Sequence, residues 1–359
     1  MKNVKEEMEL LLRENILKYW LTFMPDKENG GFYGRICGDE TLVPKANKGG
    51  ILNGRILWTF SAAYRVLGNS EYLAAATRAK DYLLENFYDH EHGGIYWELD
   101  YKGNPVDTKK QFYALGFALY GLSEYARATG DKEALDYSIR LFETIEEHSL
   151  DKEHNGYREA CTRDWKVIED MRLSDKDQNY PKSQNTHLHI IEPYTNLYRI
   201  WKDTRLERAL RNLIDIFTDK ILNPETHHLD LFFEDNWTRG GGALESYGHD
   251  IECSWLLHEA ALVLGDPTVL AKVEPIVRKV AKASEKGLLS DGSMVHEANV
   301  DTGYVDSDLH WWVQAETVVG FANIYQHFGD VDARIKSLNC WQYIKDHLIV
   351  HFQEVWEDI

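Results

Sequence analysis

The stretch QFYALGFALYGLSEYARATGDKEALDYSIRLFETIEEH, residues 111–148, contains two amphipathic segments of similar length on either side of the turn signal Gly130-Asp131. Its apolar residues recur at helical spacing, so the stretch predicts a helix, a tight turn and a second helix. The same plan recurs with the turns VLGNSEYL (66–73), WKDTRLERAL (201–210), VLGDPTVL (263–270) and HFGDVDAR (327–334). Repetition of one helical pair indicates a fold in which each pair buries its apolar face against the next.

The predicted helices do not divide evenly into pairs. They span residues 4–23, 51–67, 71–87, 110–129, 131–148, 186–202, 204–220, 249–264, 267–285, 310–327 and 331–349. A Gly-rich or aromatic segment, such as GGIYWELDYKGN at 93–104, follows each second helix and predicts a short β-hairpin before the next inner helix. A closed ring of pairs needs an even number of helices, and six pairs suit this length. We therefore expect one domain over residues 1–359, an all-α ring whose sixth pair is incomplete, with HFQEVWEDI (351–359) beginning a further hairpin.

The amino-acid composition limits the kinds of molecule that the chain can bind. The chain has 359 residues, 43% hydrophobic and 28% charged, which is typical of a globular protein. Its net charge of −19 would repel nucleic acid and anionic membranes. The acidic, amphipathic N-terminus does not resemble a secretory signal, charges interrupt every apolar stretch, and the four cysteines fit no zinc or redox spacing. We expect a cytoplasmic protein that binds neither nucleic acid nor membrane.

The predicted inner helices begin with polar and aromatic residues that are unusual for buried segments. These candidates are Asn53, Arg55, Tyr113, Asn185, His189, Glu192, Tyr247, His249, Glu252, Trp311, Trp312 and Glu316. Such a mixture suits a sugar, whose C–H faces pack on aromatic rings and whose hydroxyls need fixed hydrogen-bond partners. The positive end of a helix also keeps a nearby histidine neutral and stabilises an enediolate.

Other interpretations of these residues remain open. A single polar residue in the first turn of a helix is more often a cap than a catalyst. The spacing of His189 and His249 matches no zinc motif, so we expect no metal there. His227 and His228 are interpreted as a solvated pair in a hairpin. Two carboxylates, Glu252 and Glu316, would also suit an inverting glycoside hydrolase, although the histidines would then have no task.

Five runs together resemble a known family. They are GGILNGRILWTFSAAY (49–64), QFYALGFALYGLSEYARATGD (111–131), NTHLHIIEPYTNLYR (185–199), SYGHDIECSWLL (246–257) and WWVQAETVVGF (311–321). The chain resembles the N-acylglucosamine 2-epimerase superfamily, in particular its cellobiose (or mannobiose) 2-epimerase branch. This resemblance implies an (α/α)6 barrel and an isomerase that uses no cofactor, metal or nucleotide. It would convert the reducing-end glucose of a β-1,4-linked disaccharide such as cellobiose to mannose.

The resemblance also implies residue roles. Arg55 would hold the C1 and C2 oxygens and the enediolate, and His249 would be an acid/base group. Tyr113, Asn185 and His189 would act in binding and ring opening. Glu252, Trp311, Trp312 and Glu316 would bind the substrate and shape its subsites.

One part of the family pattern is not found in this sequence. The family takes a second acid/base histidine from a Cys-Pro-Tyr-His-like segment on its last inner helix, and no such segment occurs here. We therefore expect a chain that is shortened at its C-terminus relative to the family, and a monomer or weak homodimer. A catalytically silent sugar-binding protein is the remaining alternative.

Overall fold

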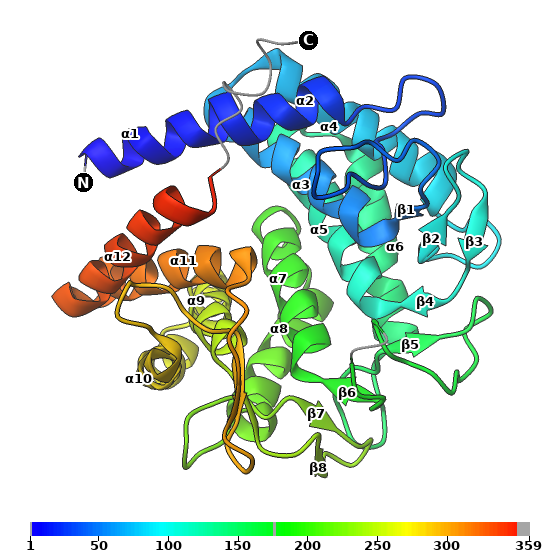
Figure 1. Ribbon diagram of the computed structural model, residues 1–359. Coiled ribbons are helices and arrows are strands. Elements are labelled where there is room, and N and C mark those ends of the chain that lie inside the picture. Colours follow the sequence, from blue (N-terminus) through cyan, green and yellow to red (C-terminus); the bar gives the residue numbers. More distant parts are fainter. Residues whose placement is uncertain (1, 175–176, 350–359) are drawn as a thin grey trace. The chain divides into compact units, whose positions relative to one another are not determined.

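The computed structural model describes residues 2–174 and 177–349 (Figure 1). Contacts between these residues define two compact units. The first comprises residues 2–148 and 160–169, and the second comprises residues 149–159 and 170–349. The single domain stays a prediction, and the hairpin expected at 351–359 lies outside the described residues. No helix in the described ranges is both long and apolar enough to cross a membrane.

The first unit contains an N-terminal helical segment and two helix pairs. Its helices are α1 (Lys2–Leu11), the π-helical turn η1 (Leu12–Leu17), α2 (Lys18–Phe23), α3 (Gly50–Leu67), α4 (Ser70–Tyr82) extended by η2 (Leu83–Phe87), α5 (Phe112–Thr129) and α6 (Lys132–His148). Helices α3 and α5 pack directly on each other. A Cβ atom added to Gly54 would lie 2.7 Å from the Phe117 carbonyl oxygen, so only glycine permits this close approach.

Short antiparallel strands precede the inner helices of the first unit. Strands β1 (Lys48–Gly49), β2 (Glu98–Leu99) and β3 (Pro105–Asp107) form one sheet in that order, and β4 (Lys110–Gln111) pairs with β5 (Ala160–Cys161). Strand β1 leads into α3 and β4 leads into α5, as the hairpin prediction requires. The hairpins therefore fix where these inner helices begin.

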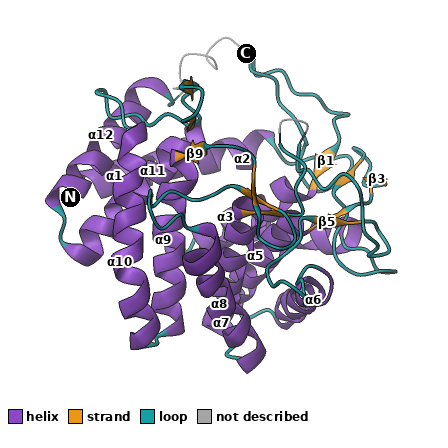
Figure 2. Cartoon of the chain, turned by 90° about the horizontal axis from the view of Figure 1, so that it is seen from below, coloured by secondary structure: helices purple, strands orange, loops and turns teal. Residues whose placement is uncertain are grey.

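The second unit contains three further helix pairs. They are α7 (Gln184–Ile200) with α8 (Thr204–Ile216) and η3 (Phe217–Ile221), α9 (Tyr247–Leu264) with α10 (Pro267–Ser284) and η4 (Glu285–Gly287), and α11 (Trp311–Phe328) with α12 (Val331–His347). Helix α9 packs against both α7 and α11 (Figure 2). Two three-stranded sheets accompany these helices. One consists of β6 (Lys182–Ser183), β7 (Phe232–Phe233) and β8 (Arg239–Gly240), and the other of β9 (Leu244–Ser246), β10 (Glu297–Asn299) and β11 (Tyr304–Asp306).

The turns between paired helices explain why the helix bounds were predictable. Gly68, Gly130, Gly265 and Gly329 each end an inner helix with a positive φ of 71–77°. That conformation favours glycine and caps the helix through the glycine N–H. Next to these glycines, side chains such as Asp266 accept the first N–H groups of the following helix.

Three hairpins are closed by the same buried ion pair. Lys48 Nζ lies 2.9 Å from Asp26 Oδ2, and Lys110 Nζ lies 2.9 Å from Asp89 Oδ2. Lys182 Nζ lies 2.8 Å from Asp151 Oδ2. Each lysine stands just before an inner helix, and each aspartate follows an outer helix. These pairs tie the first turns of α3, α5 and α7 to their hairpins.

Candidate functional site

In the first unit, Arg55 lies in the first turns of α3 and faces α5. Its Nη2 donates to the Tyr113 hydroxyl at 3.4 Å, and its guanidinium carbon lies 4.1 Å from the centre of the Phe117 ring. The side chain of Arg55 is exposed. Asn53 is buried and donates to the Gly49 carbonyl at 2.9 Å, which makes it part of the helix start. Arg55 is therefore a cation held by two aromatic side chains and still open to a ligand.

In the second unit, His189 joins two inner helices. Its Nδ1 lies 3.1 Å from Glu192 Oε2 on the same helix, as the three-residue spacing predicts. Its Nε2 lies 3.7 Å from Glu252 Oε1 on α9. The ring is 6% exposed, so these two carboxylates set its orientation. The structure thus brings together three of the predicted residues of this unit.

His249 begins α9 next to aromatic and histidine neighbours. Its Nδ1 lies 2.7 Å from Ser246 Oγ, and its ring centre lies 5.0 Å from that of Trp312. Burial, followed by the charges of His296 and His189, lowers the pKa of His249 to about 3. The imidazole is consequently neutral at physiological pH and able to accept a proton.

The two predicted tryptophans of α11 differ in environment. Trp312 packs on His249, whereas Trp311 is 67% exposed. Glu316, one turn further along α11, accepts a hydrogen bond of 2.7 Å from Trp255 Nε1 on α9. Trp312 is therefore next to the candidate base, while Glu316 links the two helices.

A pocket of about 360 Å³ in the second unit connects some of these residues. Asn185 and His249 line it, together with Glu159, whose pKa burial raises to about 7. The amide oxygen of Asn185 has no hydrogen-bond partner within the described ranges. The pocket thus offers a ligand an amide and a neutral imidazole.

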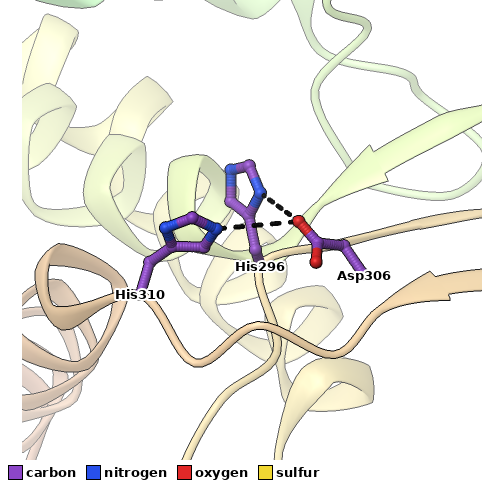
Figure 3. A group of neighbouring side chains, drawn as sticks. All are labelled: His296, Asp306 and His310. Carbon is purple, nitrogen blue, oxygen red and sulfur yellow. Dashed lines mark hydrogen bonds and ion pairs between the residues drawn. The ribbon is translucent and has the colours of Figure 1, made fainter.

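Three residues that the sequence interpretation missed also line this pocket. They are His296 in the hairpin before α11, Asp306 at the end of β11, and His310 directly before α11 (Figure 3). The ring centres of His296 and His249 are 6.2 Å apart. His310 stands beside Trp311 at a helix start, the position that marked the other candidates, and this signal could have identified it.

The interpretation of His228 as a solvated residue is wrong. Its side chain is buried, and its Nδ1 lies 2.6 Å from Asp250 Oδ2 on α9. The same carboxylate accepts the Leu229 N–H at 2.9 Å through its other oxygen. Because Asp250 is 22 residues away in the sequence, local composition could not show this burial.

Comparison with known proteins identifies the family. The family model described as N-acylglucosamine 2-epimerase (GlcNAc 2-epimerase) matches residues 31–359. The chain belongs to this family. A relative from Bacteroides fragilis named cellobiose 2-epimerase is 60% identical over 355 residues, which are 98% of this chain and 90% of the relative. Other members of the N-acylglucosamine 2-epimerase family are therefore the appropriate reference for its fold.

Solved structures support the same assignment. The cellobiose 2-epimerase from Bacillus thermoamylovorans matches with a TM-score of 0.92 and 40% identity, covering 97% of this chain and 88% of that one. The predicted (α/α)6 fold class is confirmed by this similarity. A family 76 α-mannanase from Bacteroides thetaiotaomicron matches with a TM-score of 0.61 over 91% of this chain and 82% of that one. At 17% identity, this likeness shows the fold alone.

Proposed function

We propose that this protein is a cellobiose 2-epimerase, an isomerase that interconverts glucose and mannose at the reducing end of cellobiose. The observation that carries the proposal is the 60% identity over 98% of the chain to the relative of that name from Bacteroides fragilis. The chemistry of the second unit agrees with it, because a neutral histidine lines a pocket large enough for a sugar.

His249 is the proposed base at C2 of the opened sugar. In the tautomer whose Nδ1–H donates a hydrogen bond to Ser246 Oγ, the Nε2 lone pair is available to take the C2 proton. The electrons of the C2–H bond then form the C1–C2 double bond of an enediolate, with negative charge on the C1 oxygen. Delivery of a solvent-derived proton to the opposite face of C2 gives the epimer, and His249 releases the proton that it took to solvent.

Arg55 is the proposed partner of the enediolate oxygens. A fixed cation lowers the energy of an oxyanion that develops in the transition state. Two observations in the first unit support this role: the guanidinium is exposed, and no ion pair of the described residues involves it. Its stacking on Phe117 limits its orientation without neutralising its charge.

The remaining candidates are proposed to open and bind the sugar. His189, oriented by Glu192 and Glu252, would move the proton that opens the hemiacetal ring. The other proposed substrate contacts are Tyr113, Asn185, Glu252, Trp311, Trp312 and Glu316. Trp312 offers a ring face beside His249, which suits the C–H face of a pyranose.

The finer aspects of the proposal concern the setting of the reaction. We place the enzyme in the cytoplasm as a monomer or weak homodimer, with no cofactor and with neither nucleic acid nor membrane as a partner. Proton transfer through histidine and stabilisation by arginine need no metal or redox group. Activity should therefore survive exhaustive treatment with EDTA.

Proton NMR of cellobiose incubated with the protein in deuterated water tests the function directly. The proposal expects glucosyl-mannose of unchanged connectivity, with deuterium at C2 of the reducing-end sugar. Release of glucose would instead indicate the glycoside hydrolase. Saturable binding without C2 exchange, even at high protein concentration, would indicate a silent sugar-binding protein. Either result would overturn the proposal.

A further inference from the structure

We propose that His296, Asp306 and His310 form a binding site for one divalent transition-metal ion of the zinc type. The three side chains converge from the hairpin before α11 and from the residue that precedes this helix (Figure 3). His296 Nδ1 lies 3.2 Å from Asp306 Oδ2, and His310 Nε2 lies 3.7 Å from the same oxygen. One ligand atom from each residue lies within 4.8 Å of the other two.

These separations suit a metal ion. In a tetrahedral site with bonds of about 2.0–2.1 Å, neighbouring ligand atoms are about 3.3 Å apart. The two nitrogen-to-oxygen separations are close to that value, so small side-chain rotations would admit an ion between the three groups. Two imidazoles and one carboxylate form a ligand set suited to Zn²⁺ or Co²⁺, and three protein ligands leave a position for water.

The ligands are oriented by their own supports. Asp306 Oδ1 accepts the Asp308 N–H at 3.1 Å, which leaves Oδ2 directed toward the two rings. The His296 carbonyl accepts the Tyr247 N–H at 3.0 Å, and the His310 carbonyl accepts a 3.2 Å bond from Gln314 Nε2. The Asp308 bond orients the ligand carboxylate directly, and the two backbone bonds fix the main chain that carries the imidazoles.

The position of this site gives it a consequence for the proposed reaction. His296 and His249 line the same pocket, with ring centres 6.2 Å apart. An ion held by His296, Asp306 and His310 would sit at the wall of this pocket and occupy space beside His249 that the sugar needs. Resting on the proposed function, we infer that the ion inhibits epimerisation rather than supporting it.

Metal binding is measured first, without reference to activity. Zn²⁺ is titrated by calorimetry into protein freed of metal with EDTA, and Co²⁺ is followed by its visible absorption. We expect one ion per chain with visible bands of four- or five-coordinate Co²⁺. Asp306→Asn and His310→Ala should each weaken binding by at least about tenfold.

His327→Ala is the matched control. His327 also lies against another histidine, His258, with ring centres 4.7 Å apart. Neither of these two residues lines the pocket that contains His249. This variant should bind Zn²⁺ as the unaltered protein does, and circular dichroism checks that each variant is folded. Absence of saturable binding, or equal binding by folded Asp306→Asn and unaltered protein, would overturn the metal site.

Inhibition is measured second. If the protein epimerises cellobiose, Zn²⁺ should reduce the rate over the concentration range in which it binds, and Asp306→Asn should need at least about tenfold more Zn²⁺ for half-inhibition. Inhibition that is equal in both proteins would refute the inhibitory role. Failure of the proposed epimerase reaction leaves the calorimetric test unaffected, so the two failures are distinguishable.

Discussion

The hairpins before α3, α5 and α7 differ from those before α9 and α11 in the residues that close them. The first three use a buried lysine and aspartate, as in Lys48 with Asp26. At the position of that lysine the fourth has Glu245, and it is closed by His228 against Asp250, while the last contains His296 and His310 around Asp306. The first set joins a lysine ammonium to a carboxylate, whereas the second joins imidazole rings to a carboxylate. The hairpins of one set thus serve stability, and those of the other set place imidazole rings near the starts of α9 and α11.

The largest expected effect is on catalysis, at the start of α9, which follows one of the two hairpins that contain histidines. Replacing His249 with alanine should reduce C2 exchange by about 10²–10⁴-fold, the usual contribution of a general base. Cellobiose binding should persist, because the surrounding pocket residues remain. Deuterium incorporation measured by NMR and binding measured by calorimetry separate the two effects, and His327→Ala serves as the control. Exchange at an unchanged rate would refute the role of His249.

The lysine set should affect stability instead. Lys48→Met leaves the fully buried Asp26 without its cation and should cost about 3–5 kcal/mol of unfolding free energy. Lys110→Met should cost less, because Arg163 also contacts Asp89, at 2.8 and 3.0 Å. Urea unfolding followed by circular dichroism measures both variants. Equal losses would show that Arg163 does not compensate and would break this part of the comparison.

Replacing Arg55 tests whether α3, which follows a hairpin closed by a lysine and an aspartate, also contributes to catalysis. Arg55→Ala should lower C2 exchange by about 10²–10³-fold through loss of oxyanion stabilisation, with little change in unfolding free energy because the side chain is exposed. Arg65→Ala, ten residues along α3, is the matched control. Arg65 pairs with buried Glu124 at 2.5 Å, so its removal should lower stability and spare exchange per folded molecule. The opposite pattern would contradict the assignment.

The sequence predicted the helices better than the hairpins for a physical reason. Helix ends such as Gly68 and Gly265 are set by local conformation, and the predicted bounds of the inner helices fall within about two residues of the observed ones. The buried Lys–Asp pairs escaped prediction because they join residues 21–31 positions apart. The cluster of His296, Asp306 and His310 depends on the pairing of β10 with β11, which local periodicity does not encode.

The smallest expected effect is a difference in pH dependence between the two sets of hairpins. The pKa of His249 is lowered from 6.5 to about 3, so below pH 6.5 the unfolded chain takes up a proton that the folded chain does not. The unfolding free energy is therefore not reduced by this residue above pH 6.5, and it decreases as the pH falls toward 3. The decrease amounts to about 1–2 kcal/mol at pH 5. Burial works to raise the pKa of Asp151, but the bonds from Lys182 and two backbone N–H groups outweigh it and lower the pKa to about 2. That contribution is complete above about pH 4 and is lost between pH 4 and 2. Urea unfolding between pH 8 and 4 should therefore show a smaller loss of stability in His249→Ala than in the unaltered protein. Parallel curves would mean that His249 titrates normally in the fold, and its proposed neutrality would then need another cause.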